Sequence, residues 1–371
     1  MLPMISTDRN RVGSLLVEVA LSNRTQSSRA VLQAVLALSA FHRGEHATRV
    51  DKFQRSALRG LYTHMAPNLC EGVEHIAANL LLCVLAMQQT SDRNSAWVGY
   101  ISGVKNVIDG VKGGKPCPGS DVSIILDWVY YFDVMARFSF RHWRTENVKA
   151  VAEELGFKSD GSSVCQLQYL LTQASFLQGP NIAAHAHPVV RLLAEVSDIA
   201  IYSSSPRYFS AEYQEHLNVL RSSLESISSN TGATDGVSTD LVDNTAQLLE
   251  VTRLAGLIYL ERISRNFSGQ SAKIDAWTKK ALVILKMLES CLCPFALFVV
   301  SCEVNADENR LIILDLYARM ESRPHLPSLL EVKALIQTAW IQQDLEVDGE
   351  LEYIQKLNLV MSSREVIPSF I

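Results

Sequence analysis

The sequence predicts an all-α protein, a single large helical domain spanning residues 1–371. Apolar residues recur at intervals of three and four along most of the chain, which places them on one face of a helix. Alternation of apolar and polar residues, the mark of a half-buried strand, is not sustained anywhere. Gly (18) and Pro (11) are scarce, which argues against turn-rich β folds. From this periodicity we expect about fourteen helices.

Three stretches in the first half of the chain carry the helical pattern. The first stretch precedes Phe41, and its apolar face consists of Val31, Leu32, Val35, Leu36 and Leu38. The second stripe consists of Trp97, Tyr100, Ile101, Val104, Val107 and Ile108. The third is rich in aromatic residues and contains Trp128, Tyr130, Tyr131, Phe132, Phe138, Phe140 and Trp143. Each stretch predicts one amphipathic or core helix.

The second half continues in the same way. Residues 241–263 place Leu248, Leu249, Thr252, Ala255 and Leu257 along one helix, and a further helix is expected over 272–291. Near the end, one face is formed by Val332, Leu335, Ile336, Ala339 and Trp340. Loops rich in Gly, Pro and Ser separate these helices at 110–120, 158–163, 178–180, 203–206 and 228–239. The longest, SSNTGATDGVST at 228–239, is the best place for a split into two lobes.

Composition narrows the classes of function. With 48% hydrophobic and 20% charged residues, the chain has the composition of a globular protein. Its net charge is −5, whereas nucleic-acid-binding proteins are typically basic. We therefore expect no direct nucleic-acid binding. No apolar run approaches the length of a membrane span. Seven cysteines without a CxxC pair, among them Cys291, Cys293 and Cys302, predict buried thiols in a reducing compartment, the cytoplasm.

Common catalytic motifs are missing from the sequence. It contains no GxGxxG, P-loop, HExxH or GxSxG pattern, and no Asp-Asp pair. His185 and His187 precede Pro188, and without a third ligand we interpret them as polar loop residues. Three weaker constellations remain, and each has a structural explanation beside the functional one.

The first constellation is the aromatic helix. Trp128 and Phe132 would line a cavity for a large apolar ligand or a carbocation, which aromatic faces attract. Alternatively, this is a central core helix, since aromatic side chains dominate burial in protein cores.

The second constellation is acidic. The long loop is followed by Asp240, Asp243, Asn244, Gln247 and Glu250, and positions 240, 243, 247 and 250 share one face of the expected helix. Oxygen ligands one helical turn apart suit Mg²⁺. The alternative is a solvated first turn whose acids complement the helix dipole.

The third constellation is basic. Lys286 lies one turn after Leu282, at the border of the apolar side of its helix. A lysine there could bind a diphosphate as a point charge. The alternative is a lysine whose stem covers apolar surface while its head stays in water.

Five segments together resemble the regulatory domain of fungal zinc-cluster transcription factors, which is all-α. They are SSRAVLQAVLALSAFHRG, FQRSALRGLYTHM, NSAWVGYISGVKNVID, PFALFVVSCEVNADENRLIILDLYARM and ALIQTAWIQQD, in family order between about residue 25 and residue 345. Such regulators carry an N-terminal six-cysteine zinc cluster that binds DNA. The residues printed here contain no such cluster, so the resemblance implies a regulatory-type domain without the part that binds DNA.

Within this group the chain is similar to humulene-type sesquiterpene cyclases of fungi, which lack the usual aspartate-rich motif. That resemblance implies Mg²⁺-dependent cyclisation of farnesyl diphosphate to a humulene-type hydrocarbon. It assigns Lys286 as the catalytic residue and Leu282, one turn earlier, as a residue that tunes product geometry. Trp128 and Phe132 would contact substrate, and Asp243, Asn244 and Glu250 would bind Mg²⁺. The sequence leaves open whether the chain is an enzyme, and the missing zinc cluster favours a terpene cyclase.

The alternative is a non-catalytic transcription regulator or interaction module that lacks the DNA-binding zinc cluster. Its helices would bind partners or a small effector, and it would work in the nucleus.

Overall fold

The computed structural model describes most of the chain. Outside the description are residues 1–8, 23–24, 64–68, 90–95, 111–119, 144–185, 200, 202–204, 228–238, 322–326, 346–351 and 365. The predicted loops at 158–163 and 178–180 lie in these ranges, as does the predicted lobe boundary at 228–239 apart from Thr239.

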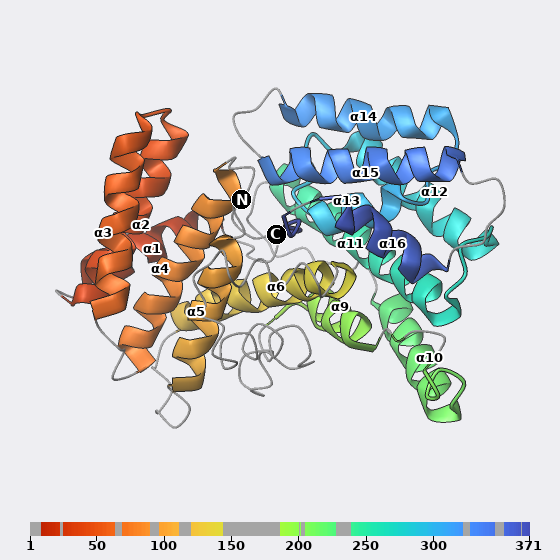
Figure 1. Cartoon of the computed structure of the whole chain (residues 1–371), viewed down its shortest axis with the longest axis horizontal. Coiled ribbons are helices and arrows are strands. Elements are labelled where there is room, and N and C mark those ends of the chain that lie inside the picture. The colour runs from red at the N-terminus through yellow and green to blue at the C-terminus, as the bar shows by residue number, and fades with distance from the viewer. Residues whose placement is uncertain are drawn as a thin grey trace. The chain divides into compact units, whose positions relative to one another are not determined.

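The described residues form helices and connections, without a strand, and the predicted all-α class is confirmed (Figure 1). In chain order the helices are α1 (Arg9–Ser22), α2 (Gln26–His42), α3 (Ala47–Thr63), α4 (Leu69–Gln88), α5 (Ala96–Gly110), α6 (Ser120–His142), α9 (Pro188–Ile199), α10 (Ala211–Ser226), α11 (Thr239–Arg265), α12 (Ala272–Met287), α13 (Pro294–Ser301), α14 (Asp307–Glu321), α15 (Pro327–Leu345) and α16 (Tyr353–Ser362). None of these described helices is both long and apolar enough to cross a membrane.

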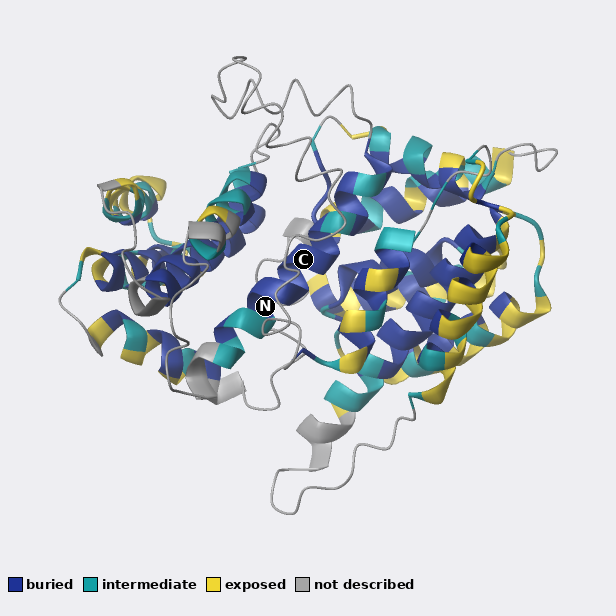
Figure 2. Ribbon diagram, turned by 90° about the horizontal axis from the view of Figure 1, so that it is seen from below, coloured by how far each residue is buried: buried dark blue, intermediate teal, exposed yellow. Residues whose placement is uncertain are grey.

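The helices fall into two compact units. The N-terminal unit comprises Met1–Asp133 and Val148–Ala186, and the C-terminal unit comprises Val134–Asn147 and His187–Ile371. Each unit has a buried helix surrounded by others that expose one side (Figure 2).

In the N-terminal unit, α2 packs closely on α3 because small residues meet between them. Ala30, Ala34, Ala37 and Ala40 of α2 are buried. A Cβ on Gly60 of α3 would lie only 3.1 Å from the Cβ of Ala30. Helix α4, which contacts both α2 and α5, is buried along most of its length, from Val73 to Gln88.

In the C-terminal unit, the buried helix is α11, which contacts α9, α10, α12, α13 and α16. Phe138, fully buried near the end of α6, lies at the centre of an aromatic cluster in this unit. Its ring meets five other rings edge-to-face at centroid distances of 4.9–6.2 Å, those of His142, Tyr259, Phe295, Phe298 and Phe370. Edge-to-face contacts of this kind add to the stabilisation from burial alone.

The predicted face before Phe41 is wrong: of its residues only Val31 is buried and Leu36 is exposed, because α2 packs with its alanines instead. The face predicted near the end of the chain is buried as expected. Val332, Leu335, Ile336, Ala339 and Trp340 are all at most 7% exposed. The helix predicted over 272–291 ends at Met287, four residues early. The chain then passes through Cys291 and Cys293 into α13. Neither thiol is in a disulfide, and both are fully buried; Cys302 is 8% exposed. This confirms the prediction that these three thiols are buried.

Candidate functional site

The candidate site is a pocket of about 690 Å³ in the C-terminal unit, which we call the C-terminal pocket. Its wall comes from four places: the end of α11 with the loop after it, the segment after α13, the last turns of α15, and α16. A volume of this size is typical of sites that enclose a small organic molecule.

An ion pair forms the innermost part of the wall. Arg262, in the last turn of α11, donates from Nη2 to Oε2 of Glu303 at 2.5 Å and from Nε to Oε1 at 3.0 Å. Their side chains are only 8% and 6% exposed. The second guanidinium branch donates to the carbonyl oxygens of Phe267, at 2.8 Å, and Gly269, at 2.6 Å. Arg262 therefore ties the loop after α11 to the segment after α13.

The end of α11 explains why that loop lies where it does. Asn266 adopts a positive φ of 45°, a conformation that asparagine tolerates at a helix end better than most residues. Its side chain donates to Glu352 at 2.5 Å and accepts from the backbone N–H of Ile354 at 3.2 Å. These two bonds hold the start of α16 against the end of α11. A Cβ on Gly269 would lie 2.0 Å from the tip of the Phe267 ring, so only glycine leaves room for that ring.

The remaining wall mixes apolar and polar side chains. Ala339, Leu357 and Val360 supply apolar surface, whereas Gln342 and Lys356 supply polar ends. Gln343 donates to the carbonyl oxygen of Cys302. Its Oε1 and the hydroxyl of Tyr353 are buried without a hydrogen-bond partner in the described part of the chain. Hydrogen-bonding capacity is thus left unsatisfied in the pocket wall, and such capacity is costly to bury.

Electrostatics at the pocket favours binding over proton transfer. Burial opposes the charge of Arg262, but the hydrogen bonds and charge of Glu303 outweigh it and raise the pKa of the guanidinium. Burial, followed by the charge of Glu303, raises the pKa of Tyr353 well above its usual value. The Arg262 guanidinium lies over the Tyr353 ring at 5.8 Å. The guanidinium of Arg262 and the phenol of Tyr353 therefore keep their protons near neutral pH.

A smaller pocket of about 270 Å³ adjoins the first. Arg262, Phe267 and Gln270 belong to the walls of both. The loop carrying Phe267 separates the two cavities, and Phe267 itself is 54% exposed. Movement of this one ring would change the shape of both.

The residues predicted to bind a diphosphate and its hydrocarbon chain belong to two different units. Lys286 lies in the last turn of α12 with an exposed side chain, whereas Leu282 is 4% exposed. Trp128 and Phe132 are 1% and 3% exposed and meet edge-to-face at 5.8 Å within the N-terminal unit. None of the four lines the C-terminal pocket. Their roles in substrate binding stay predictions.

The predicted metal ligands lie on α11. Asn244 is exposed, and the side chain of Asp243 is outside the described residues. Glu250 accepts hydrogen bonds from Arg253 at 2.7 and 2.8 Å and from Lys280 at 2.6 Å. Burial alone would raise the pKa of Glu250, but these two cations outweigh burial and lower it. Where the chain is described, no cluster of three or more His, Cys, Asp or Glu suits a metal ion.

A further buried polar group, His142, was not singled out from the sequence. His142 lies between the hydroxyl of Tyr259, at 2.8 Å, and Oδ1 of Asn358, at 2.9 Å, and burial lowers its pKa to about 3. His187, predicted as a loop residue, precedes α9, and its Nδ1 accepts from the N–H of Val189 at 3.2 Å. The predicted role of His187 is confirmed.

Comparison with known proteins decides the family. The sequence model of the fungal specific transcription factor domain matches residues 1–358. The chain belongs to this family. The match covers both units of the fungal transcription factor domain, and it confirms the resemblance to the regulatory domain of fungal transcription factors.

A curated relative supports the same assignment of this fungal transcription factor domain. Transcription factor iacI of Pestalotiopsis fici is 32% identical over 378 residues, which cover 100% of this chain and 91% of that protein. No solved structure matches the chain. The finer resemblance to sesquiterpene cyclases receives no support from these comparisons.

Proposed function

We propose that this chain is a non-catalytic transcription regulator whose C-terminal pocket binds a small amphipathic effector. The observation that carries the proposal is the match of the fungal transcription factor domain to residues 1–358. It is supported by the name of the relative, a transcription factor aligned to the whole chain. This function places the protein in the nucleus.

The pocket suits binding more than chemistry. Its acid, Glu303, is held by the guanidinium of Arg262, and its phenol, Tyr353, is buried. General acid–base catalysis needs a group that gains or loses a proton near the working pH. The apolar surface of Leu357 and Val360 beside the polar ends of Gln342 and Lys356 fits a ligand with a hydrocarbon body and a polar or anionic end.

A ligand could transmit its presence because the pocket joins distant segments. The loop after α11, the segment after α13 and the start of α16 meet through Arg262 and Asn266. Binding that favours one arrangement of these segments shifts the population toward it. The surface shown to transcriptional partners would change as a result.

The binding test uses an amphipathic fluorescent anion, 1-anilinonaphthalene-8-sulfonate, as the probe. The tested variant is Gln342→Trp, which fills the pocket from a partly exposed position, and the matched control is Ile341→Trp, whose exposed side chain lies outside the wall. We expect wild type and Ile341→Trp to bind the probe with equal affinity, and we expect the affinity of Gln342→Trp for the probe to be at least about tenfold lower. Equal binding by all three would remove the pocket from the proposal.

The regulatory part is tested in cells. The full chain is fused to an unrelated DNA-binding domain and its effect on a reporter gene is measured. We expect reporter output to change with wild type and with Ile341→Trp, and the change to be reduced with Gln342→Trp. A fusion that is expressed, nuclear and without effect on the reporter would contradict the regulatory function.

A further inference from the structure

Four basic side chains lie on one face of α3, and we call them the α3 basic face: Arg49, Lys52, Arg55 and Arg59. All four residues are exposed. Their spacing of three, three and four residues keeps them within an arc of about 120° of the helix surface. At a rise of 1.5 Å per residue they extend over about 15 Å.

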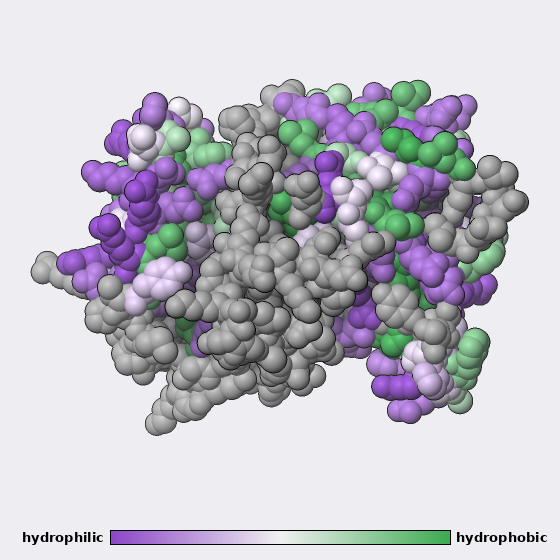
Figure 3. All heavy atoms as spheres, in the orientation of Figure 1, coloured by the Kyte–Doolittle hydropathy of each residue, from purple (hydrophilic) through white to green (hydrophobic). Residues whose placement is uncertain are grey.

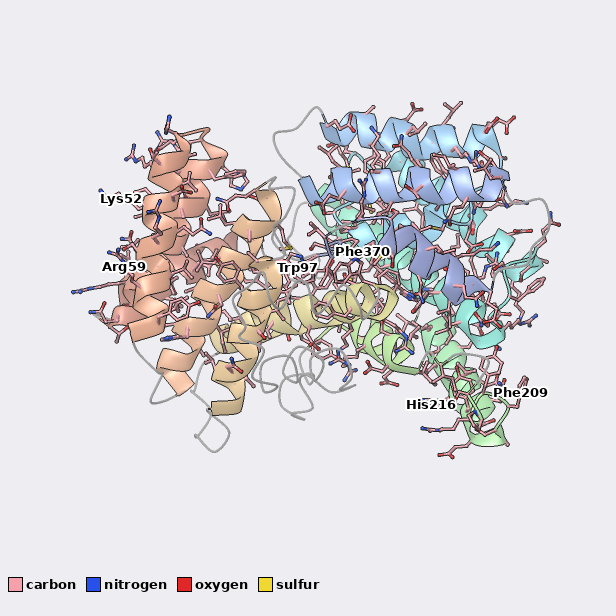
Figure 4. The ribbon with its side chains drawn as sticks, in the orientation of Figure 1. Lys52, Arg59, Trp97, Phe209, His216 and Phe370 are labelled. Atoms are coloured by element: carbon pink, nitrogen blue, oxygen red, sulfur yellow. The ribbon has the colours of Figure 1, made fainter. Side chains whose placement is uncertain are left out.

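This face points away from the helices on which α3 packs. Val50 and Ala57, 3% and 0% exposed, occupy the opposite side of α3, and Gly60 touches Ala30 of α2. In Figure 4 the labelled side chains of Lys52 and Arg59 project outward from α3. Figure 3 shows hydrophilic residues along the same edge of this unit.

The charge here is opposite to that of the whole protein. Residues 25–63 hold six Lys or Arg and two Asp or Glu, a net charge of +4, while the chain carries −5. The two acids pair with arginines of the face: Arg49 with Glu45, whose side chain is 21% exposed, at 2.9 Å, and Arg55 with the exposed Asp51 at 3.7 Å. Both arginines are themselves exposed, and ion pairs of exposed side chains contribute little stability. Among described residues Lys52 has no ionic partner.

We propose that the α3 basic face binds the phosphate backbone of double-stranded DNA without reading its sequence. Between the cations lie Thr48 and Ser56, both exposed and polar. A protein interface requires an apolar core, and a membrane-surface helix requires an apolar face, whereas this arc has neither. Binding to DNA phosphates requires only cations, since the released counterions supply the free energy. Arginine also pairs two donors with one phosphate.

The proposal goes beyond the proposed regulatory function and does not depend on the C-terminal pocket. It supplies phosphate contacts from the regulatory domain itself, which would add to those of any sequence-reading part bound to the same DNA. Phosphate contacts of this kind position a protein on the duplex and carry no sequence information.

The experiment measures anisotropy of a labelled 20-base-pair duplex with the full chain between 50 and 200 mM salt. Four neutralised phosphates predict a slope of log K against log[salt] of about −3.6, or a loss of affinity of about 150-fold over this range. The variant Lys52→Gln/Arg55→Gln leaves two cations, so the slope falls to about −1.8 and the loss to about 12-fold. The matched control is Lys273→Gln/Lys279→Gln, two exposed lysines of α12.

The expected result is a reduced slope for the α3 variant and an unchanged slope for the α12 control, with two unrelated duplex sequences bound equally. The proposal is overturned if wild type does not bind at 50 mM salt, or if both variants weaken binding equally. It is also overturned if polyglutamate of equal charge displaces the duplex as well as unlabelled duplex does. That outcome would assign the face to an acidic protein partner.

Discussion

Arg262 and Glu303 are 41 residues apart in the sequence, and their side chains form an ion pair with three hydrogen bonds between 2.5 and 3.2 Å. Arg262 also holds two carbonyl oxygens of the loop that follows its own helix. One guanidinium thus donates hydrogen bonds both to the Glu303 carboxylate and to the carbonyl oxygens after the end of α11, in the wall of the C-terminal pocket. Five donors in a fixed planar fork make arginine suited to this position.

Removing one partner of this pair leaves a buried charge without compensation. We expect Glu303→Gln to lower the free energy of unfolding by about 3–5 kcal/mol. Urea denaturation followed by tryptophan fluorescence measures it. The control is Glu321→Gln, which breaks the more exposed pair with Lys333 and is expected to cost less than about 1 kcal/mol. Equal costs would show that the Arg262 pair does not support the pocket wall.

The buried His142 makes stability depend on pH. Its pKa of about 3 in the folded protein lies below the usual value of about 6.5. As the pH falls, the unfolded chain therefore takes up this proton first, and stability decreases between pH 6.5 and pH 3 by up to about 1.4 kcal/mol per pH unit. We expect His142→Gln to flatten this dependence. The exposed His216→Gln is the control and should retain the wild-type slope.

Two glycines within helices predict opposite effects of the same substitution. A Cβ on Gly256 of α11 would lie 2.7 Å from Cδ2 of Leu193, which is 1% exposed. Overpacking of about 1–3 kcal/mol should exceed the helix-propensity gain of about 1 kcal/mol, so Gly256→Ala destabilises. Gly99 of α5 has no atom within 4 Å of its added Cβ, and Gly99→Ala should raise the melting temperature. A higher melting temperature for Gly256→Ala would show that α9 moves aside freely.

The sequence led to two hypotheses, a terpene cyclase and a transcription regulator, and a test for enzymatic activity distinguishes them. For a regulator, we expect no sesquiterpene hydrocarbon when the full chain is incubated with farnesyl diphosphate and Mg²⁺, as measured by gas chromatography–mass spectrometry. EDTA serves as the blank. A Mg²⁺-dependent product that disappears in Lys286→Ala but persists in Lys279→Ala would restore the cyclase hypothesis. It would also establish Lys286, exposed at the end of α12, as the catalytic residue.

The helices were predictable because their signal is local. The faces that start at Trp97, Leu248 and Val332 follow from the period of 3.6 residues. The Val332 face is buried throughout, whereas Tyr100, Val107 and Ile108 of the Trp97 face are half-buried. The sequence allowed two interpretations of the aromatic run of α6, a cavity wall or a core helix. Trp128, Phe132 and Phe138 are all buried, as the interpretation as a core helix requires. Periodicity identifies which side of a helix is apolar.

The candidate site was not predictable in the same way. Glu261 and Arg262 interrupt an otherwise apolar stretch of α11, and this interruption was the available signal for a buried charge. The sequence does not say which acid meets Arg262, because Glu303 arrives from beyond α12 and α13. The α3 basic face was readable from the spacing of Arg49, Lys52, Arg55 and Arg59, but the acidic net charge of the whole chain hid it.

By itself, the sequence determined the all-α class and the family, since both depend on patterns that lie along the chain. Tertiary structure alone decided that Lys280 of α12 pairs with Glu250, that Lys286 stays at the surface, and that Arg262 and Glu303 share a pocket. The physical reason is that an ionisable side chain acquires its role from burial and from its partners. Those partners come from segments that only the folded chain brings together.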